Sequence, residues 1–206
     1  HQGRVVILGG GVVGQNAAQM AVGLGASVTI IDKSLDVLRH LDARFGHQVQ
    51  TLYATQDAII EETLTADLVI GAVLVPGASA PKLVTREMVS QMKKGSVLVD
   101  VAIDQGGCFE TSKPTTHAAP TYIVDGVVHY CVANMPGAVA RTSAAALNNA
   151  TLPFVLLLAD KGAEAAMRVD PHLLHGLNVY QGKVTNLQVS EAHGMAYSAP
   201  ENIIAA

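Results

Sequence analysis

Residues 5–32 read VVILGGGVVGQNAAQMAVGLGASVTIID: an apolar run, three glycines, a helix-like stretch and a second apolar run that ends in an acid. Both apolar runs are continuous rather than alternating, which is typical of strands that are buried on both faces of a parallel sheet. Small and apolar residues recur at helical spacing over 12–24, and Gly25 stands where such a helix would end. The pattern predicts a strand–helix–strand unit with a glycine loop at its first turn.

The glycine loop fits the pattern G-x-G-x-x-G through Gly9, Gly11 and Gly14, between a strand and a helix as the pattern requires. Gly9 would permit the tight turn, Gly11 the close approach of a pyrophosphate, and Gly14 close packing of the helix on the strand. Asp32 ends the second strand, where a carboxylate can bind both ribose hydroxyls and repel a 2′-phosphate. We therefore predict binding of NAD rather than NADP, a preference that Lys33 weakens slightly. The alternatives are a structural turn that binds nothing and a site for another nucleotide, such as the adenosine of a methyl donor.

Strand-like and helix-like segments continue to alternate for about 135 residues, which predicts an α/β fold with a doubly wound parallel sheet. Ser34, Thr55 and Thr85 are the expected N-caps of three of its helices. The expected strands lie at 4–8, 27–32, 49–53, 66–73 and 96–102, with one or two more within 121–134, and the expected helices at 12–24, 35–44, 56–63 and 86–92.

The pattern changes after Pro136. The next segment looks like two helical runs that break near Pro153, and the rest of the chain is polar and irregular, with no sheet of its own. We therefore expect a dinucleotide-binding Rossmann domain at 1–138, followed by a crossing helix and a C-terminal helical and irregular segment of a second domain at 139–206.

Composition excludes some classes of partner. The net charge of −4 and the pI near 6.0 give no reason to expect nucleic-acid binding. The longest apolar run, LPFVLLLA at 152–159, is shorter than the roughly 18 residues of a membrane span, so we expect no membrane partner. No signal peptide is apparent, and Cys108 and Cys131 form no CxxC pair, so we expect a cytoplasmic protein with two buried thiols. The eight histidines suggest no metal site.

The carboxyl ends of the later strands should face the same crevice as the glycine loop. Asp104 follows the strand at 96–102 and Asn134 follows the last strand, so both could reach the nicotinamide half of a dinucleotide. Each could equally be a turn or capping residue.

Four longer segments are distinctive: GGGVVGQNAA, ADLVIGAVLVPGASAPKLVT, GSVLVDVAIDQGGCFETSKPTTH and YCVANMPGAVARTSAAALNNATLPFVLLLA. Together they resemble the alanine dehydrogenase family, which shares its fold with the NAD-binding subunit of proton-translocating transhydrogenase. The resemblance runs from about residue 4 to 175. It implies reversible oxidative deamination of L-alanine to pyruvate and ammonium, with NAD taking the hydride.

The resemblance also implies roles for single residues. Asp104 resembles the active-site aspartate of the family, which lies next to nicotinamide and substrate. The residues that resemble the cofactor site are Gly9, Gly11, Val12 and Gly14 at the pyrophosphate, Asp32 at the ribose, Val73 and Leu83 beside the adenosine, and Val101, Asp104, Val132, Asn134 and Met135 around the nicotinamide.

This sequence departs from the family pattern at its beginning. A substrate domain that supplies an arginine, a lysine and a histidine precedes the nucleotide domain in the family, and the chain begins HQGRVV without it. We therefore expect a piece of a longer or trimmed protein that binds NAD, turns over little or no alanine alone, and forms a homo-oligomer, which in the family is a hexamer. A non-catalytic NAD(H)-binding module of a transhydrogenase-like complex is the alternative. A related dehydrogenase acting on saccharopine or lysine is a third reading, against which the IDQGG and ANMPG segments argue.

Overall fold

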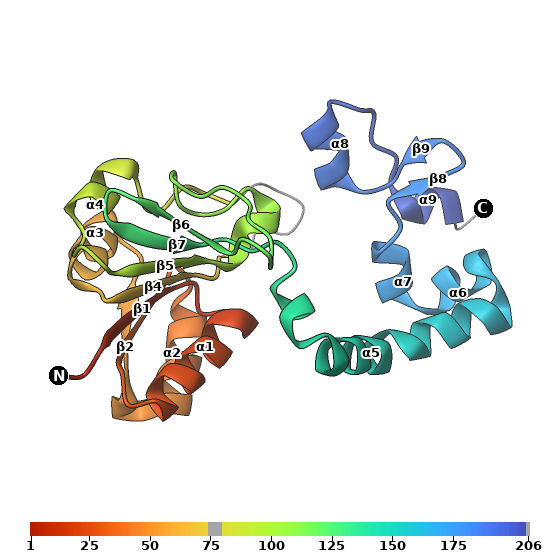
Figure 1. Ribbon diagram of the computed structural model, residues 1–206. Helices are drawn as coiled ribbons and strands as arrows, with labels where there is room; N and C mark the ends of the chain where they lie inside the picture. Colours follow the sequence, from red (N-terminus) through yellow and green to blue (C-terminus); the bar gives the residue numbers. More distant parts are fainter. Residues whose placement is uncertain (74–79, 205–206) are drawn as a thin grey trace. The chain divides into compact units, whose positions relative to one another are not determined.

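The computed structural model describes residues 1–73 and 80–204, and these residues form two compact units. The first comprises the described residues up to Met135, and the second those from Pro136 onward (Figure 1). Residues 74–79, which belong to the segment ADLVIGAVLVPGASAPKLVT that resembles the family, lie outside the described residues.

The first unit is built on a seven-stranded sheet in the order β3-β2-β1-β4-β5-β7-β6. The strands are β1 (Arg4–Leu8), β2 (Ser27–Asp32), β3 (Val49–Tyr53), β4 (Leu68–Gly71), β5 (Val97–Asp100), β6 (Thr121–Val124) and β7 (Val127–Tyr130). All neighbours pair in parallel except β6 and β7, which form an antiparallel hairpin. The order reverses between β1 and β4, which confirms the predicted doubly wound fold and places a crevice at that point.

Helices cover both faces of this sheet (Figure 1). They are α1 (Val12–Gly23), α2 (Leu35–Phe45), α3 (Gln56–Thr65) and α4 (Arg86–Gln91), with short 3₁₀ segments η1 (Gly46–Gln48) and η2 (Val101–Gln105). Alternate residues of β1 point to opposite faces: Val5 and Ile7 pack with α1 and α2, and Val6 and Leu8 pack with α3 and α4. The continuous apolar run of β1 is thus explained by burial on both sides.

Short polar residues fix the ends of these elements as the sequence predicted. The hydroxyls of Ser34, Thr55 and Thr85 each accept a hydrogen bond from the backbone N–H three residues later, which caps α2, α3 and α4. Asp125 and Gly126 both have positive φ, 52° and 84°, in the two-residue turn that joins β6 to β7. A turn of this kind matches the twist of the hairpin strands.

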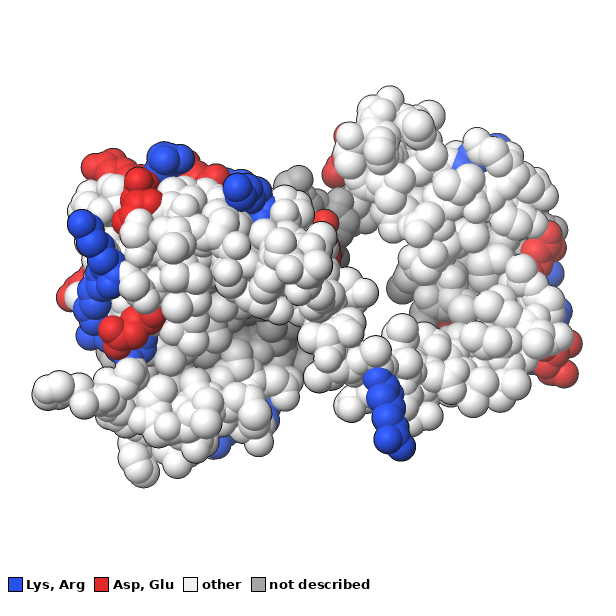
Figure 2. Space-filling view, in the orientation of Figure 1, with Lys and Arg blue, Asp and Glu red and all other residues white. Residues whose placement is uncertain are grey.

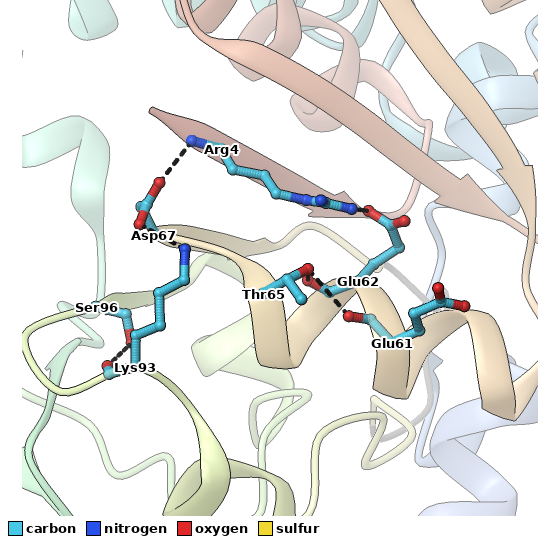
Figure 3. Close-up of polar contacts among 7 residues, drawn as sticks. All are labelled: Arg4, Glu61, Glu62, Thr65, Asp67, Lys93 and Ser96. Atoms are coloured by element: carbon cyan, nitrogen blue, oxygen red, sulfur yellow. Dashed lines mark hydrogen bonds and ion pairs between the residues drawn. The ribbon is translucent and has the colours of Figure 1, made fainter. Parts of the chain in front are cut away.

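A charged cluster joins β1 to α3 and to the loop before β4 at the start of these strands (Figure 3). Arg4 donates from its backbone to Asp67 at 2.8 Å and from its guanidinium to Glu62 at 2.6 Å. Lys93 donates to the other oxygen of Asp67 at 3.0 Å. The backbone bond from Arg4, and then the bond from Lys93, hold the pKa of Asp67 below its usual value. Glu62 is only 7% exposed, so Arg4 neutralises a carboxylate that is buried.

A polar network lies inside the unit between β6, β7 and the loop that precedes them. His129 is fully buried; its Nδ1 donates to the carbonyl of Val127 at 3.0 Å, and its Nε2 lies 2.7 Å from the hydroxyl of Thr111. Burial lowers the pKa of His129 and so favours the neutral ring. Cys108 and Cys131 are both buried free thiols, as predicted, and burial raises the pKa of Cys108.

The second unit is more regular than predicted. It contains η3 (Met135–Val139), α5 (Ala140–Lys161), α6 (Ala163–Val169), α7 (Pro171–His175), β8 (Val179–Tyr180), β9 (Lys183–Val184), α8 (Leu187–His193) and α9 (Pro200–Ile204), although η3 begins at the last residue of the first unit. The predicted break near Pro153 is wrong, because α5 continues through Pro153 and the break falls at Gly162 with φ 76°. A proline costs a helix one hydrogen bond, whereas a positive φ ends it and favours glycine. The expected absence of a sheet is also wrong, since β8 and β9 pair across Gln181 and Gly182.

The long helix α5 leaves every one of its side chains at least partly exposed. The stretch Met135–Lys161 is long and apolar enough to cross a membrane by length and composition, with a window of mean hydropathy 1.3. The search for continuous apolar runs did not single out this stretch, which passes by its average. Alanines, leucines and valines raise the average over 18 residues, although polar residues interrupt them and no continuous apolar run of that length forms.

Replacing Arg4 by methionine should destabilise the first unit, because the buried carboxylate of Glu62 loses its partner. We expect a loss of about 1–3 kcal/mol in the free energy of unfolding, measured by urea titration followed by circular dichroism. The matched control is Arg39→Met, which breaks an exposed pair with Asp36 and should cost less than about 0.5 kcal/mol. Equal losses in the two variants would contradict this account of Glu62.

Acid should weaken the fold through His129. The unfolded chain protonates this ring near the ordinary value of 6.5, whereas the folded chain does so only at a lower pH. The stability that the neutral His129 ring contributes to the folded state is complete above about pH 6.5 and is lost as the pH falls below that value. We expect the wild-type chain to lose stability between pH 7 and 5 more steeply than His129→Gln, which keeps a polar partner for Thr111 and does not titrate. Parallel slopes for the two proteins would show that His129 titrates alike in both states.

Candidate cofactor site

A cavity of about 460 Å³ opens at the carboxyl ends of β1, β2, β3 and β4, at the point where the strand order reverses. Its walls are mostly apolar. The lining residues are Leu8, Gly9, Gly11, Val12, Val13, Ile31, Asp32, Lys33, Val37, Ala54, Ile59, Ala72, Val73, Pro81 and Leu83. Six of the predicted cofactor residues line this cavity: Gly9, Gly11 and Val12 from the glycine loop, Asp32 from β2, and Val73 and Leu83 from the segment after β4.

The three predicted glycines have different reasons to be glycine. Gly9 has φ 104°, and a Cβ there would come within 2.7 Å of the carbonyl oxygen of Ala72. A Cβ on Gly14 would overlap the carbonyl oxygen of Gly9, so α1 can approach β1 only without it. Gly11 has φ −68°, and a Cβ there would meet no described atom within 4 Å. The fold requires glycine at 9 and 14, whereas at Gly11 the absent side chain leaves room in the cavity itself.

The first turn of α1 carries no acidic residue, and no side chain caps it. Its first backbone hydrogen bond runs from Gln15 N–H to the carbonyl of Gly11 at 3.0 Å, so the N–H groups before Gln15 face the loop. Helix N-termini with unused N–H groups attract phosphates through these donors and the helix dipole. Val12 and Val13, exposed on this turn, line the cavity beside them.

Asp32 stands at the end of β2 on the cavity wall. One carboxylate oxygen accepts from Gly10 N–H at 2.7 Å and the other from Ser34 N–H at 2.8 Å. These bonds fix the carboxylate between the glycine loop and the start of α2. Each oxygen retains a second lone pair, so Asp32 can still accept from two vicinal hydroxyls. Lys33 also lines the cavity, next to this anion.

Several lining residues were not predicted to be there. Ala54 follows β3 directly, and the rule that ligands bind at carboxyl ends of strands could have found it. Ile59, Val37 and Pro81 belong to helices or loops whose packing brings them to the wall, and no sequence pattern marks them.

The residues predicted around a nicotinamide lie at the ends of β5 and β7, outside the described cavity. Asp104 is exposed on η2, and Asn134 is exposed with φ 56°, while its carbonyl contacts His117 Nε2 at 3.0 Å. Val101 and Met135 are half-buried, and Val132 is fully buried. Their roles toward a ligand stay predictions. Among the described residues, no three His, Cys, Asp or Glu side chains gather as metal ligands could.

The loop that follows Asp104 is held from inside by Asp100, a buried carboxylate at the end of β5. Asp100 accepts from the backbone N–H of Cys108 at 2.9 Å and of Phe109 at 3.4 Å, and from the hydroxyl of Ser112 at 2.5 Å. A Cβ on Gly107 would come within 2.6 Å of the same oxygen. The loop therefore folds back over Asp100.

The cavity fits the adenosine and pyrophosphate part of a dinucleotide. It offers donors at a helix N-terminus, room above Gly11, a fixed carboxylate for a ribose and apolar walls for a base.

Comparisons with known proteins agree with this geometry. A sequence profile described as "Alanine dehydrogenase/PNT, C-terminal domain" matches residues 1–187. A similar relative is an alanine dehydrogenase from Halomonas elongata, 64% identical over 201 residues that make up 98% of this chain and 54% of that protein. The chain thus spans about half the length of the curated relatives it matches.

Two solved structures that resemble this chain belong to proteins with the same names as the family profile. An L-alanine dehydrogenase superposes with a TM-score of 0.85 at 53% identity, covering 93% of this chain and 53% of the other. A transhydrogenase from Sinorhizobium meliloti superposes with a TM-score of 0.60 at 31% identity, covering 67% of this chain and 40% of the other. The chain therefore belongs to the alanine dehydrogenase and pyridine nucleotide transhydrogenase family, of which it carries the C-terminal domain.

Proposed function

We propose that this chain is the NAD-binding part of an alanine dehydrogenase. Family membership supports NAD as the cofactor and an oxidoreductase as the class of enzyme. The observation that carries the proposal is the cavity, in which Gly11 leaves room that the fold does not need and Asp32 presents a fixed carboxylate. A carboxylate in that position repels the 2′-phosphate of NADP.

The proposed reaction is reversible oxidative deamination of L-alanine to pyruvate and ammonium, in which bound NAD accepts the hydride. The glycine loop and Asp32 would hold the adenosine half of the cofactor. Asp104, exposed at the end of β5, would lie next to nicotinamide and substrate, with Val101, Val132, Asn134 and Met135 around it.

The 206 residues alone should turn over little or no L-alanine. Hydride transfer requires the substrate carboxylate to be fixed over the nicotinamide, and positioning of this kind contributes about 7–11 kcal/mol. The chain spans about half the length of its curated relatives, so we propose that residues outside these 206 fix that carboxylate.

The relatives favour alanine dehydrogenase over a transhydrogenase module. Identity is 53% with the solved L-alanine dehydrogenase and 31% with the solved transhydrogenase, and the TM-scores fall in the same order. A transhydrogenase-like role remains the second candidate because that structure shares the fold.

We further propose that protein, rather than lipid, covers α5, and that the chain works as a homo-oligomer in the cytoplasm. Side chains such as Leu147, Val155 and Leu156 are 55–66% exposed on this helix, and Figure 2 shows its surface mostly uncharged. Asn148 and Asn149 lie mid-helix, where a bilayer would leave their amides without partners. An interface can satisfy such amides.

Calorimetric titration of the purified chain with NAD and NADP tests the proposal. We expect NAD to bind and NADP to bind at least about tenfold more weakly, because Asp32 repels the 2′-phosphate. The same sample should reduce NAD with L-alanine far more slowly than the rate of about 1–10³ s⁻¹ that is typical of enzymes. Absence of any NAD binding by the folded chain would refute the proposed site, and turnover at an enzymatic rate would refute the proposed dependence on further residues.

Alanine at two glycines should separate cofactor binding from folding. Gly11→Ala should change the free energy of unfolding by no more than about 1 kcal/mol, since the added methyl meets no described atom. It should weaken NAD binding at least about tenfold, because the methyl occupies the pyrophosphate position. Gly14→Ala is the matched control and should destabilise the fold by at least about 2 kcal/mol through overlap with the carbonyl of Gly9. Unchanged NAD affinity in Gly11→Ala would place the phosphates elsewhere.

A further inference from the structure

Lys82 lies between two residues of the cavity wall, Pro81 and Leu83, but does not itself line the cavity. Its ammonium instead reaches the loop after η2, where it donates to the carbonyl of Gly106 at 2.5 Å and of Gly107 at 2.7 Å, with Phe109 at 3.4 Å. An ammonium has three N–H donors. All three therefore have a backbone acceptor, which leaves Lys82 no donor for a phosphate or a substrate carboxylate.

The same short loop is thus held by two opposite charges. The buried carboxylate of Asp100 accepts from the backbone N–H groups of Cys108 and Phe109. The ammonium of Lys82 donates to the carbonyls of Gly106 and Gly107 in the same loop. Hydrogen bonds to charged groups are about twice as strong as neutral ones. The loop that begins at Asp104 therefore has its backbone polar groups fixed in both directions.

Backbone pairing joins the two segments as well. Ala80 N–H donates to the carbonyl of Gln105 at 3.0 Å, and Leu83 N–H donates to the carbonyl of Cys108 at 2.8 Å. Val84 pairs with Phe109 in an isolated parallel bridge. The segment that lines the cavity wall and the loop after Asp104 are therefore hydrogen-bonded to each other. Among the hydrogen bonds described between residues 80–85 and 100–109, Lys82 provides the only ones from a charged side chain.

We propose that Lys82 is a positioning residue that sets the place of the η2 loop, and with it Asp104, relative to the cofactor cavity. The inference rests on the proposed function and deepens it. Lys82 acts on the nicotinamide half of the cofactor through the loop. The adenosine half depends on the glycine loop and Asp32, which Lys82 does not contact.

The test compares NADH with ADP-ribose, which lacks the nicotinamide, in Lys82→Met. We expect the wild-type chain to bind NADH at least about tenfold more tightly than ADP-ribose. In Lys82→Met the affinity for ADP-ribose should stay within about twofold, while NADH should weaken at least about fivefold. The emission spectrum of bound NADH should also shift toward that of free NADH, a signal that a general loss of stability would not produce in the fraction still bound.

Lys93→Met is the matched control, because it removes a lysine that bonds Asp67 at the opposite end of the sheet. Both affinities should remain at wild-type values in this variant. If Lys82→Met does not fold, Lys82→Arg and Lys82→Gln carry the test. Arginine keeps the charge and several donors, so the NADH preference should decline from wild type to arginine to glutamine.

The outcomes separate the two proposals. If the wild-type chain binds neither ligand, the proposed function fails and this inference fails with it. If the wild-type chain binds NADH and ADP-ribose with equal affinity, Lys82 has no positioning role and the proposed NAD site stands. The same holds if Lys82→Met lowers the two affinities equally or changes neither. An NADH preference that does not follow the order of the three side chains overturns the inference in the same way.

Discussion

The close approach of α1 to β1 is the constraint on which the rest of the first unit depends. The carbonyl of Gly9 and the Cα of Gly14 leave no room for a methyl group between strand and helix. Because the helix begins this close to the strand, its N-terminus points at the crevice beside β4, and Asp32 can bond the loop at Gly10. Packing and the proposed site thus share one cause: the geometry that buries the small face of α1 also directs toward the crevice the helix N-terminus at which we propose that the pyrophosphate binds.

The two ends of the sheet use charge in different ways. At the amino ends, Arg4 and Lys93 pair with Glu62 and Asp67, so the charges there neutralise one another (Figure 3). At the carboxyl ends, most charged groups bond to backbone instead: Asp32, Asp100 and Lys82 hold loops by their N–H or carbonyl groups. Backbone-anchored charges fix loop geometry without forming an ion pair, which suits an end of the sheet that has to receive a ligand.

The sequence was most informative where local physics is sufficient. Strands β1, β2 and β3 begin and end as predicted, because a glycine or a capping residue follows each of them within two residues. Local sequence also placed six of the predicted cofactor residues on one cavity, whereas their binding of adenosine stays a proposal. The end of α5 was not, because Pro153 costs a long helix only one bond, while Gly162 actually ends it. The contacts of Lys82 were not predictable at all, since backbone carbonyls have no signature in sequence.

The central position of β1 has a consequence for synthesis on the ribosome. Its two neighbours are β2 and β4, and the bond from Arg4 to Asp67 spans 63 residues. At about 5–20 residues per second, β1 waits about 3–13 s until its second partner has been synthesised. During that time only the β1–β2 side can pair, and the other edge stays open to any chain nearby. The strand order that places a crevice between β1 and β4 therefore also sets the interval in which one edge of β1 has no native partner.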